Sequence, residues 1–327
     1  MSFYLYAETA FHHEGSKDYL IGLVKEAKKA GVHGVKFQIL VELTEFMSPF
    51  HSAFEDAKSW ILSAEEWTEV FNYTKRIGLD IIAMPLDLKA FDLISTYDIK
   101  YIEIHSVSFK DEKLFSALDG TRTPVMFGVG GRTMEEINAV VKKYHNRDLT
   151  LMMGFQSFPT DLVNVKLTKI KQLCELYSGC AIGYADHSSF DDEMAITSNE
   201  YAYLLGARVF EKHITKEEGK ERIDFQSAIG AKKMKIIKQK LEYLEIITYC
   251  DDGNLFDLND KELDYRNREK TPVASRDIFP GEIMTNEMVN LKMIDSTENI
   301  NSLKELVGLE IKTKILKNES FFEKDLI

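Results

Sequence analysis

Two histidines in the second half of the chain have the residue type and the neighbours of a metal site. His187 lies in GYADHSS (183–189) and His213 in FEKHIT (210–215), with Asp186 directly before the first and Glu211 two positions before the second. Neutral imidazoles bind borderline divalent metals, and carboxylates or water complete the coordination shell. The alternative is one exposed histidine and one buried, satisfied histidine. Spacing alone does not decide between the two.

Lys36 is a second candidate functional residue, because it lies inside the apolar segment GVKFQIL (34–40). A lysine in such a segment is either paired with an acid or directed into a polar cavity. In a cavity, its ammonium would bind phosphate or carboxylate. Glu8, at the end of the first apolar run, is a candidate partner in either case.

The segment GVGGRT (128–133) follows an apolar run and precedes a helical pattern. Backbone N–H groups in such a glycine-rich turn can bind phosphate. A plain turn is the commoner interpretation of so short a motif.

Short apolar runs alternate with longer amphipathic segments from Phe3 to about residue 247. The runs span 3–7, 34–38, 79–84, 101–105, 124–129, 149–155, 180–185 and 208–213. Continuous apolarity is typical of parallel strands that are buried on both faces. Strict alternation with helices predicts an α/β fold, a (β/α)8 TIM barrel. A doubly wound sheet is the rival, but the segment after the first run, AETAFHHEG (7–15), lacks its glycine-rich phosphate turn.

Several of the helical intervals have particular features. SAEEWTEVFNYTKRIG (63–78) has Glu66 at the capping-box position after Ser63. DLKAFDLISTY (87–97) and DEKLFSALDG (111–120) leave room only for short helices. VNVKLTKIKQLCELY (163–177) is predicted as a single helix.

In a barrel, the side chains just past the C-terminal ends of the strands meet at one mouth. The polar residues at or after those ends are therefore the candidate site residues. They are Glu8, His12, His13, Lys36, Gln38, Glu103, His105, Ser106, Gln156, Asp186, His187, Glu211 and His213, with Asp224 on the loop after the last strand. His105 carries no further signal for a role.

The composition changes after the predicted barrel. We expect a barrel domain at 1–250, a polar linker at 251–269 and a small, mostly-β domain at 270–327. Within the last, DIFPGEIMTNEMV (277–289) and KILKNESFFEKDLI (314–327) share a turn residue, Gly281 or Asn318, followed directly by a glutamate. A domain of this size is marginal alone, so we expect it to pack on a partner surface.

The composition also excludes some classes of protein. The net charge of −12 argues against a nucleic-acid footprint. Cys174, Cys180 and Cys250 show neither metal-ligand spacing nor a disulfide framework, and the sequence has no secretory signal or membrane-spanning run. We therefore expect a cytoplasmic protein without nucleic-acid or membrane partners.

Taken in order, these segments resemble the sialic acid synthase family, N-acetylneuraminate synthase and related nonulosonate synthases. AETAFHHEG is similar to the family's AEIGxNHNG, and AGVHGVKFQ (30–38) to its AGADAVKFQ. GYADHS (183–188) matches its GLSDHT, and GARVFEKHIT (206–215) its GAxxxEKHFT. The tail VASRDIFPGEIMTNEMVNLKMI (273–294) resembles the family's antifreeze-like (SAF) domain. The resemblance spans essentially the whole chain.

The resemblance implies a transferase that joins phosphoenolpyruvate to an N-acetylmannosamine-type amino sugar. The product is a nine-carbon keto acid used in surface polysaccharide or flagellin decoration, and phosphate is released. A divalent ion, Mn²⁺ first and Mg²⁺ or Co²⁺ as alternatives, would be held by His187 and His213. Glu8 would act as acid/base or contact metal-bound water, and Lys36 would hold phosphoenolpyruvate. Gln38, Glu211 and Asp224 would contact the sugar or metal-bound water, with Ser106, Gln156 and Asp186 as further substrate contacts.

The chain departs from the family at several phosphate contacts. Where the family has KIxSxE, this chain has EIHSVS (103–108), so Glu103 replaces a lysine while Ser106 is retained. Met84 replaces a threonine, Ala185 a serine, and Gln156 an asparagine, and in the tail Met293 stands where the family has an arginine.

These departures bear on phosphoenolpyruvate binding. Each lost hydrogen bond to a charged group costs about 1.5–3 kcal/mol, so together they predict weaker binding. Glu103 would add repulsion unless a metal or Arg132 compensates. The alternatives are a metal-dependent carbonyl lyase or isomerase that does not use phosphoenolpyruvate, and a non-catalytic sugar-binding relative. The resemblance also implies a homodimer in which the tail of one subunit covers the barrel mouth of the other.

Overall fold

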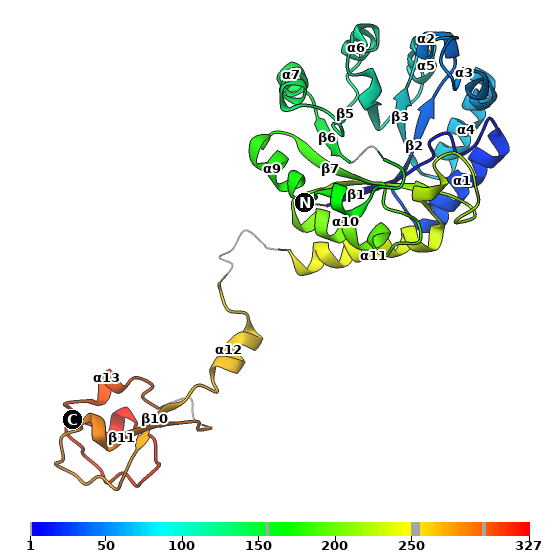
Figure 1. The fold of residues 1–327 in the computed structure, drawn as a ribbon. Helices are drawn as coiled ribbons and strands as arrows, with labels where there is room; N and C mark the ends of the chain where they lie inside the picture. The colour runs from blue at the N-terminus through cyan, green and yellow to red at the C-terminus, as the bar shows by residue number, and fades with distance from the viewer. Residues whose placement is uncertain (1, 155–156, 250–255, 296–298) are drawn as a thin grey trace. The chain divides into compact units, whose positions relative to one another are not determined.

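The computed structural model describes residues 2–154, 157–249, 256–295 and 299–327 (Figure 1). The chain divides into two compact units, Met1–Tyr249 and Cys250–Ile327.

The first unit is a closed barrel of parallel strands (Figure 1). Each strand pairs with the next, and pairing of the first with the eighth closes the barrel, with Glu8 opposite both Lys36 and His213. The strands are β1 (Tyr4–Glu8), β2 (Gly34–Ile39), β3 (Asp80–Pro85), β4 (Tyr101–Ile104), β5 (Val125–Gly128), β6 (Leu149–Met153), β7 (Ala181–Asp186) and β8 (Val209–Ile214), with a short β9 (Ala228–Ile229) beside β8. The predicted (β/α)8 barrel is confirmed.

Helices surround the barrel (Figure 1). They are α1 (Lys17–Ala30), α2 (Leu43–Phe46), α3 (Phe54–Ala57), α4 (Ala64–Arg76), α5 (Leu88–Ile94), α6 (Glu112–Asp119), α7 (Met134–Tyr144), α8 (Leu162–Val165), α9 (Thr168–Leu176), α10 (Met194–Leu204) and α11 (Ala231–Ile247). Three short 3₁₀ turns are η1 (Lys58–Trp60), η2 (Ser106–Ser108) and η3 (Phe225–Ser227).

Local sequence explains where several helices begin and end. The capping box of α4 is present, because the Ser63 hydroxyl accepts from the Glu66 N–H and the Glu66 carboxylate accepts from the Ser63 N–H. The third and fourth intervals do hold only short helices, of 7 and 8 residues. The single helix predicted over 163–177 is wrong: Lys166 adopts a left-handed conformation (φ 47°) and separates α8 from α9.

The core of the first unit has two layers. Between barrel and helices lies a large apolar cluster that includes Trp67, Phe71 and Phe210. Inside the barrel, Tyr6 and Met152 belong to a smaller cluster. Because strand side chains alternate between faces, Tyr6 and Glu8 share the inner face of β1 and lie one above the other beneath the mouth.

The second unit has its own small core, which includes Ile278, Ile311 and Phe321. Its elements are α12 (Asp260–Arg266), β10 (Thr271–Ala274), η4 (Asn286–Met288), β11 (Val289–Lys292), α13 (Leu303–Leu306) and η5 (Glu323–Asp325), and β10 pairs with β11 in antiparallel fashion. Part of the region expected as a linker, 251–255, lies outside the described residues, as does residue 250.

The two similar segments of the tail adopt the same local structure. Gly281 and Asn318 both have positive φ (90° and 71°). The glutamate after each accepts a hydrogen bond from the backbone three residues earlier, Glu282 from Phe279 at 2.8 Å and Glu319 from Leu316 at 2.6 Å. The sequence similarity therefore reflects a repeated turn.

Candidate active site

A cavity with a volume of about 40 Å³ lies at the C-terminal ends of the barrel strands. It brings together most of the residues predicted from the strand ends. Those that line it are Lys36, Gln38, Glu103, His105, Ser106, His187, Glu211, His213 and Asp224. Gln156 lies outside the described residues.

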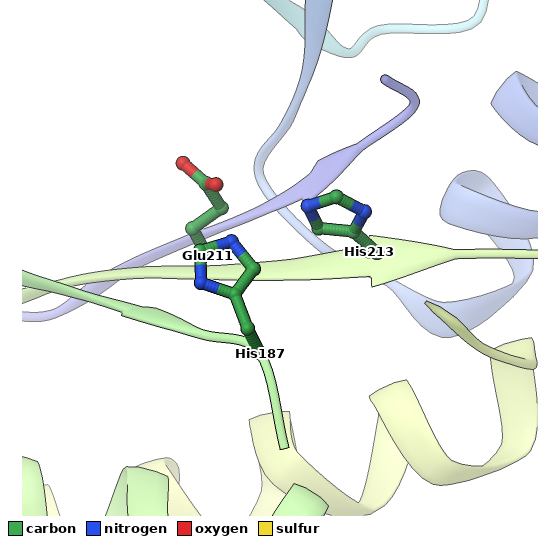
Figure 2. Close-up of side chains that lie close together, drawn as sticks. All are labelled: His187, Glu211 and His213. Carbon is green, nitrogen blue, oxygen red and sulfur yellow. The ribbon is translucent and has the colours of Figure 1, made fainter. Parts of the chain in front are cut away.

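His187 and His213 lie side by side at this mouth, from the loop after β7 and from β8 (Figure 2). Their ring centroids are 5.2 Å apart. One nitrogen of each and one carboxylate oxygen of Glu211 all lie within 4.8 Å of one another. Burial lowers the pKa of His187 to about 4 and that of His213 well below 6.5, so both rings are neutral at pH 7. Two neutral imidazoles with a carboxylate fit a borderline divalent metal.

Glu211 as a third potential metal ligand goes beyond the sequence prediction, which gave it a contact with sugar or metal-bound water. Its Oε2 accepts hydrogen bonds from the Tyr6 hydroxyl and from the Lys36 ammonium, both at 2.6 Å. Tyr6 was not predicted as a site residue, although its position two residues before Glu8 on the same strand face is a signal that could have identified it.

The ammonium of Lys36 is surrounded by three buried carboxylates. Its Nζ lies 3.0 Å from Glu8, 3.0 Å from Glu103 and 2.6 Å from Glu211. Glu8 also accepts from the Gln38 amide at 3.2 Å and from the Ala10 N–H at 2.8 Å. The carboxyl group of Glu8 therefore contacts both Lys36 and Gln38. The positive charge of Lys36 is balanced by carboxylates of the protein itself.

These carboxylates differ in their affinity for protons. Burial raises the pKa of Glu103 to about 7, against the attraction of Lys36. Burial is also the largest single influence on Glu211, but Lys36 and His187, together with the hydrogen bonds from Lys36 and Tyr6, outweigh it and lower the pKa of Glu211. At neutral pH, Glu211 is thus the ionised partner of Lys36, and Glu103 lies close to its midpoint of protonation.

Asp224 occupies an unusual backbone conformation at the rim of the cavity. Its φ is +61°, in the left-handed region that aspartate tolerates better than most residues. Burial raises the pKa of its carboxyl group. The strained turn before η3 thus directs an acid toward the mouth.

Asp186 does not line the cavity, in contrast to its predicted role as a substrate contact. Its Oδ2 lies 2.8 Å from the fully buried Lys212 Nζ, and its Oδ1 accepts from the N–H and hydroxyl of Ser188 at 2.9 and 2.6 Å. Lys212 also donates to the Ser188 carbonyl at 2.9 Å. Lys212 faces away from the barrel interior because its neighbours on β8, Glu211 and His213, face inward. This ion pair fixes the turn that carries His187.

Three of the positions that depart from the family lie on the cavity wall. Met84, Glu103 and Ala185 all line it, as do Gly128 and Met152. Arg132 does not line this cavity: its guanidinium lies over the Phe109 ring at 5.5 Å and its Nη1 is 3.5 Å from Glu136. Arg132, one of the two compensators that the sequence left open, therefore does not offset the charge of Glu103. Instead, Lys36 contacts Glu103.

Two further cavity residues had no predicted role: Phe158 was missed, and His105 was only noted as a strand-end residue. The ring of Phe158 lies 4.6 Å from that of His187 and 5.9 Å from that of His213. Phe158 lies on a loop after β6, where no periodic pattern identifies it. His105, at the end of β4, also lines the cavity, and burial lowers its pKa to about 4.

Comparison with known proteins decides the family. The model of the NeuB family matches residues 23–249, well over half of the chain. The chain belongs to the NeuB family. The resemblance to sialic acid synthases, and with it the prediction of an enzyme of the synthase type, is confirmed.

Individual relatives of this NeuB-family chain extend the match. It is 27% identical over 327 residues to "Uncharacterized protein MJ1065" of Methanocaldococcus jannaschii, covering 99% of this chain and 94% of that protein. It is 25% identical to a pseudaminic acid synthase of Campylobacter jejuni, covering 94% and 89%. The structure of a spore coat polysaccharide biosynthesis protein E from Chromobacterium violaceum has the same fold, with a TM-score of 0.82, 22% identity and complete coverage of both chains.

In the ranges that the structure describes, the helices are too short or too polar to cross a membrane.

Proposed function

We propose that this chain condenses phosphoenolpyruvate with the open-chain aldehyde of an N-acetylmannosamine-type amino sugar, giving a nine-carbon 2-keto acid and phosphate. The observation that carries this proposal is the grouping of His187, Glu211 and His213 in a barrel mouth that also holds Lys36, Gln38 and Asp224. The names of the relatives, which include synthases of pseudaminic acid, N,N'-diacetyllegionaminic acid and N-acetylneuraminate 9-phosphate, support the same class of reaction.

In this proposal, His187 and His213 hold a divalent cation, and Glu211 is a third ligand or holds a metal-bound water. Mn²⁺ is the first candidate, with Mg²⁺ and Co²⁺ as alternatives. The bound ion would supply Lewis-acid polarisation of the aldehyde oxygen. The two neutral rings are suited to this role, because no proton must leave before a metal binds.

The remaining residues would bind and orient the substrates. Lys36 and Ser106 would hold the anionic co-substrate, and Gln38 and Asp224 would hydrogen-bond the sugar. The methylene carbon of phosphoenolpyruvate forms the new bond to the aldehyde carbon, and water adds to the carbon that bears the phosphate. Glu8 would accept a proton from that water, and this proton would go to the alkoxide that the aldehyde becomes. The bond between the phosphate-bearing carbon and the bridging oxygen would then break, so that phosphate leaves with the bridging oxygen and the added oxygen becomes the keto oxygen.

The test is a turnover assay with Mn²⁺, phosphoenolpyruvate and a panel of N-acylated mannose-type and dideoxy amino sugars. Phosphate release that depends on both substrates, with a keto acid detected by mass spectrometry, is the expected result. Absence of turnover with every sugar, in protein shown to bind Mn²⁺, would contradict the proposal.

A second candidate is a metal-dependent lyase or isomerase that acts on a carbonyl compound without a phosphorylated partner. The contact between Glu103 and Lys36 favours it, because the ammonium that would meet the co-substrate is already surrounded by three carboxylates. Methionine and alanine at positions 84 and 185 add no hydrogen-bond donor to the wall.

Calorimetric titration with phosphoenolpyruvate separates the two candidates. Metal-dependent binding in the micromolar range excludes the second candidate. No binding to the metal-loaded protein, together with cleavage or isomerisation of a keto sugar acid, favours it.

We also propose that the chain is a cytoplasmic homodimer in which the tail, as an SAF-type domain, covers the barrel mouth of a second copy. Exposed apolar side chains occur on barrel loops, such as Phe50 and Val107, and on the tail, such as Phe279 and Ile283. Contact with a second copy would remove the apolar surface of such side chains from water. Sedimentation of a monomer at micromolar concentration would contradict this arrangement.

A further inference from the structure

We propose that the barrel carries a second small-molecule site, on the outer side of its wall between β5, β6 and helices α7 to α9, that takes a small organic acid with an apolar body. A cavity there offers about 360 Å³ to water. The inference goes beyond the proposed function, because no residue that lines this cavity lines the mouth cavity.

Strand alternation separates the two cavities. Gly128 on β5 and Met152 on β6 face the mouth, whereas the next residues, Val129 and Met153, line the outer cavity. With Ile137 of α7 and Leu173 of α9, which are also buried, they form an apolar floor. Such a floor suits the hydrocarbon part of a ligand.

The rim of the outer cavity is cationic. Its charged lining residues are Arg132, at the entrance to α7, and Lys169, on α9. The Nε of Arg132 is buried without a hydrogen-bond partner, and its nearest acid, Glu136, is at the long distance of 3.5 Å. Glu136 is otherwise engaged, because its second oxygen accepts from the Thr133 N–H at 2.9 Å.

Lys169 makes no ion pair with any residue that the structure describes. Asn164 and Gln172 add amide groups to the same lining. The lining thus combines a guanidinium whose ion pair with Glu136 is long, an ammonium that forms no ion pair with a described residue, amide groups and a buried apolar surface. A carboxylate can pair with a guanidinium through two parallel hydrogen bonds. These features together select a carboxylate attached to an apolar body.

The test is calorimetric titration of the full-length protein with hexanoate as the probe. We expect a dissociation constant in the millimolar range or tighter, as for a small fragment. The double variant Arg132→Gln/Lys169→Gln is expected to bind at least about tenfold more weakly, since charge-assisted hydrogen bonds are lost. The matched control is Lys142→Gln/Lys171→Gln, which removes the same charge from α7 and α9 at exposed positions and should bind as the wild type does.

Further titrations, with other probes and with a further variant, locate the ligand and define its chemistry. Hexan-1-ol, which lacks the charge, and inorganic phosphate, which lacks the apolar body, are each expected to bind more weakly than hexanoate. His213→Ala is expected to leave hexanoate binding unchanged, which separates this site from the mouth and from the proposed function. The inference is overturned if hexanoate does not bind, if the Arg132/Lys169 double variant binds it as tightly as the wild type, if hexan-1-ol or phosphate binds equally well, or if His213→Ala abolishes binding.

Discussion

The barrel wall at β5 and β6 separates two cavities that differ in how closely their cations are paired with carboxylates. In the mouth, one ammonium, Lys36, meets three carboxylates within 3.0 Å. Outside the wall, Arg132 has its nearest acid at 3.5 Å, and Lys169 has none among the described residues. A lysine in a cavity is therefore not by itself an anion site. What matters is whether the protein already supplies its counter-charge.

The largest expected difference between the cavities is in stability. Lys36→Met leaves three buried carboxylates without their shared cation, and we expect it to lower the free energy of unfolding by about 3–5 kcal/mol. Arg132→Met removes a cation whose ion pair with Glu136 is long and partly exposed, and we expect a change within about 0.5 kcal/mol. Urea unfolding measures both. Equal losses of unfolding free energy for the two variants would contradict the distinction between a cation that is closely paired with carboxylates and one that is not.

Metal binding should belong to the mouth alone. His213→Ala removes one of two imidazoles, and we expect the affinity for Mn²⁺ to fall more than about 100-fold, because losing a direct ligand exceeds the loss of an outer hydrogen-bond partner. The exposed His145 provides the matched control, His145→Ala, which should retain the wild-type affinity. Calorimetric titration with Mn²⁺ measures both. Undiminished affinity in His213→Ala would place the ion elsewhere.

Protonation of Glu103 gives the mouth a pH dependence. Burial raises its pKa from 4.5 to about 7 in the folded state, so the folded protein holds this proton more tightly than the unfolded chain. The stability from this proton is present below pH 4.5 and is lost as the pH rises to about 7. Glu103→Gln keeps the shape without the titration. We expect its stability relative to wild type to increase by on the order of 2 kcal/mol between pH 5 and pH 8.

Urea unfolding at the two pH values tests this expectation. Glu112→Gln, at an exposed position on α6, is the control and should show no such change. If the free energy of unfolding of Glu103→Gln differs from that of wild type by the same amount at both pH values, the prediction is wrong and the Glu103 carboxyl group does not titrate in this range.

The smallest expected effect concerns the wall that lost its polar donors. Ala185→Ser would return a hydroxyl group to the mouth, and we expect phosphoenolpyruvate to bind about two- to tenfold more tightly, the value of one hydrogen bond. Calorimetric titration compares it with Ala139→Ser, at an exposed position on α7. No gain at Ala185 would mean that this part of the wall does not face the anion.

The sequence was sufficient for the barrel and for much of the mouth. Continuous apolar runs identified the eight parallel strands, since strands buried on both faces need no polar side. The rule that strand ends meet at one mouth then brought Lys36, His187 and His213 together, although they are far apart in the sequence.

The sequence was insufficient where the role of a residue depends on which way its side chain points or on which residue it pairs with. Asp186 lies between two cavity residues in the chain and Arg132 shortly after Gly128, but Asp186 contacts Lys212 outside the barrel and Arg132 lines the outer cavity. The pairing of Lys36 with Glu103 depends on how β2, β3 and β4 align, which no local pattern specifies. Phe158 reaches the histidines from an irregular loop.

Closure of the barrel by β1 and β8 has a consequence for biosynthesis. Lys36 and Glu211 are 175 residues apart in the chain, and Glu8 lies opposite His213 across the closing seam. A ribosome must therefore extend the polypeptide past β8 before the first strand can find its last neighbour. Until then, Lys36 lacks Glu211 as a counter-charge and the nascent barrel keeps two open edges, so this seam is where a chaperone would have most to protect.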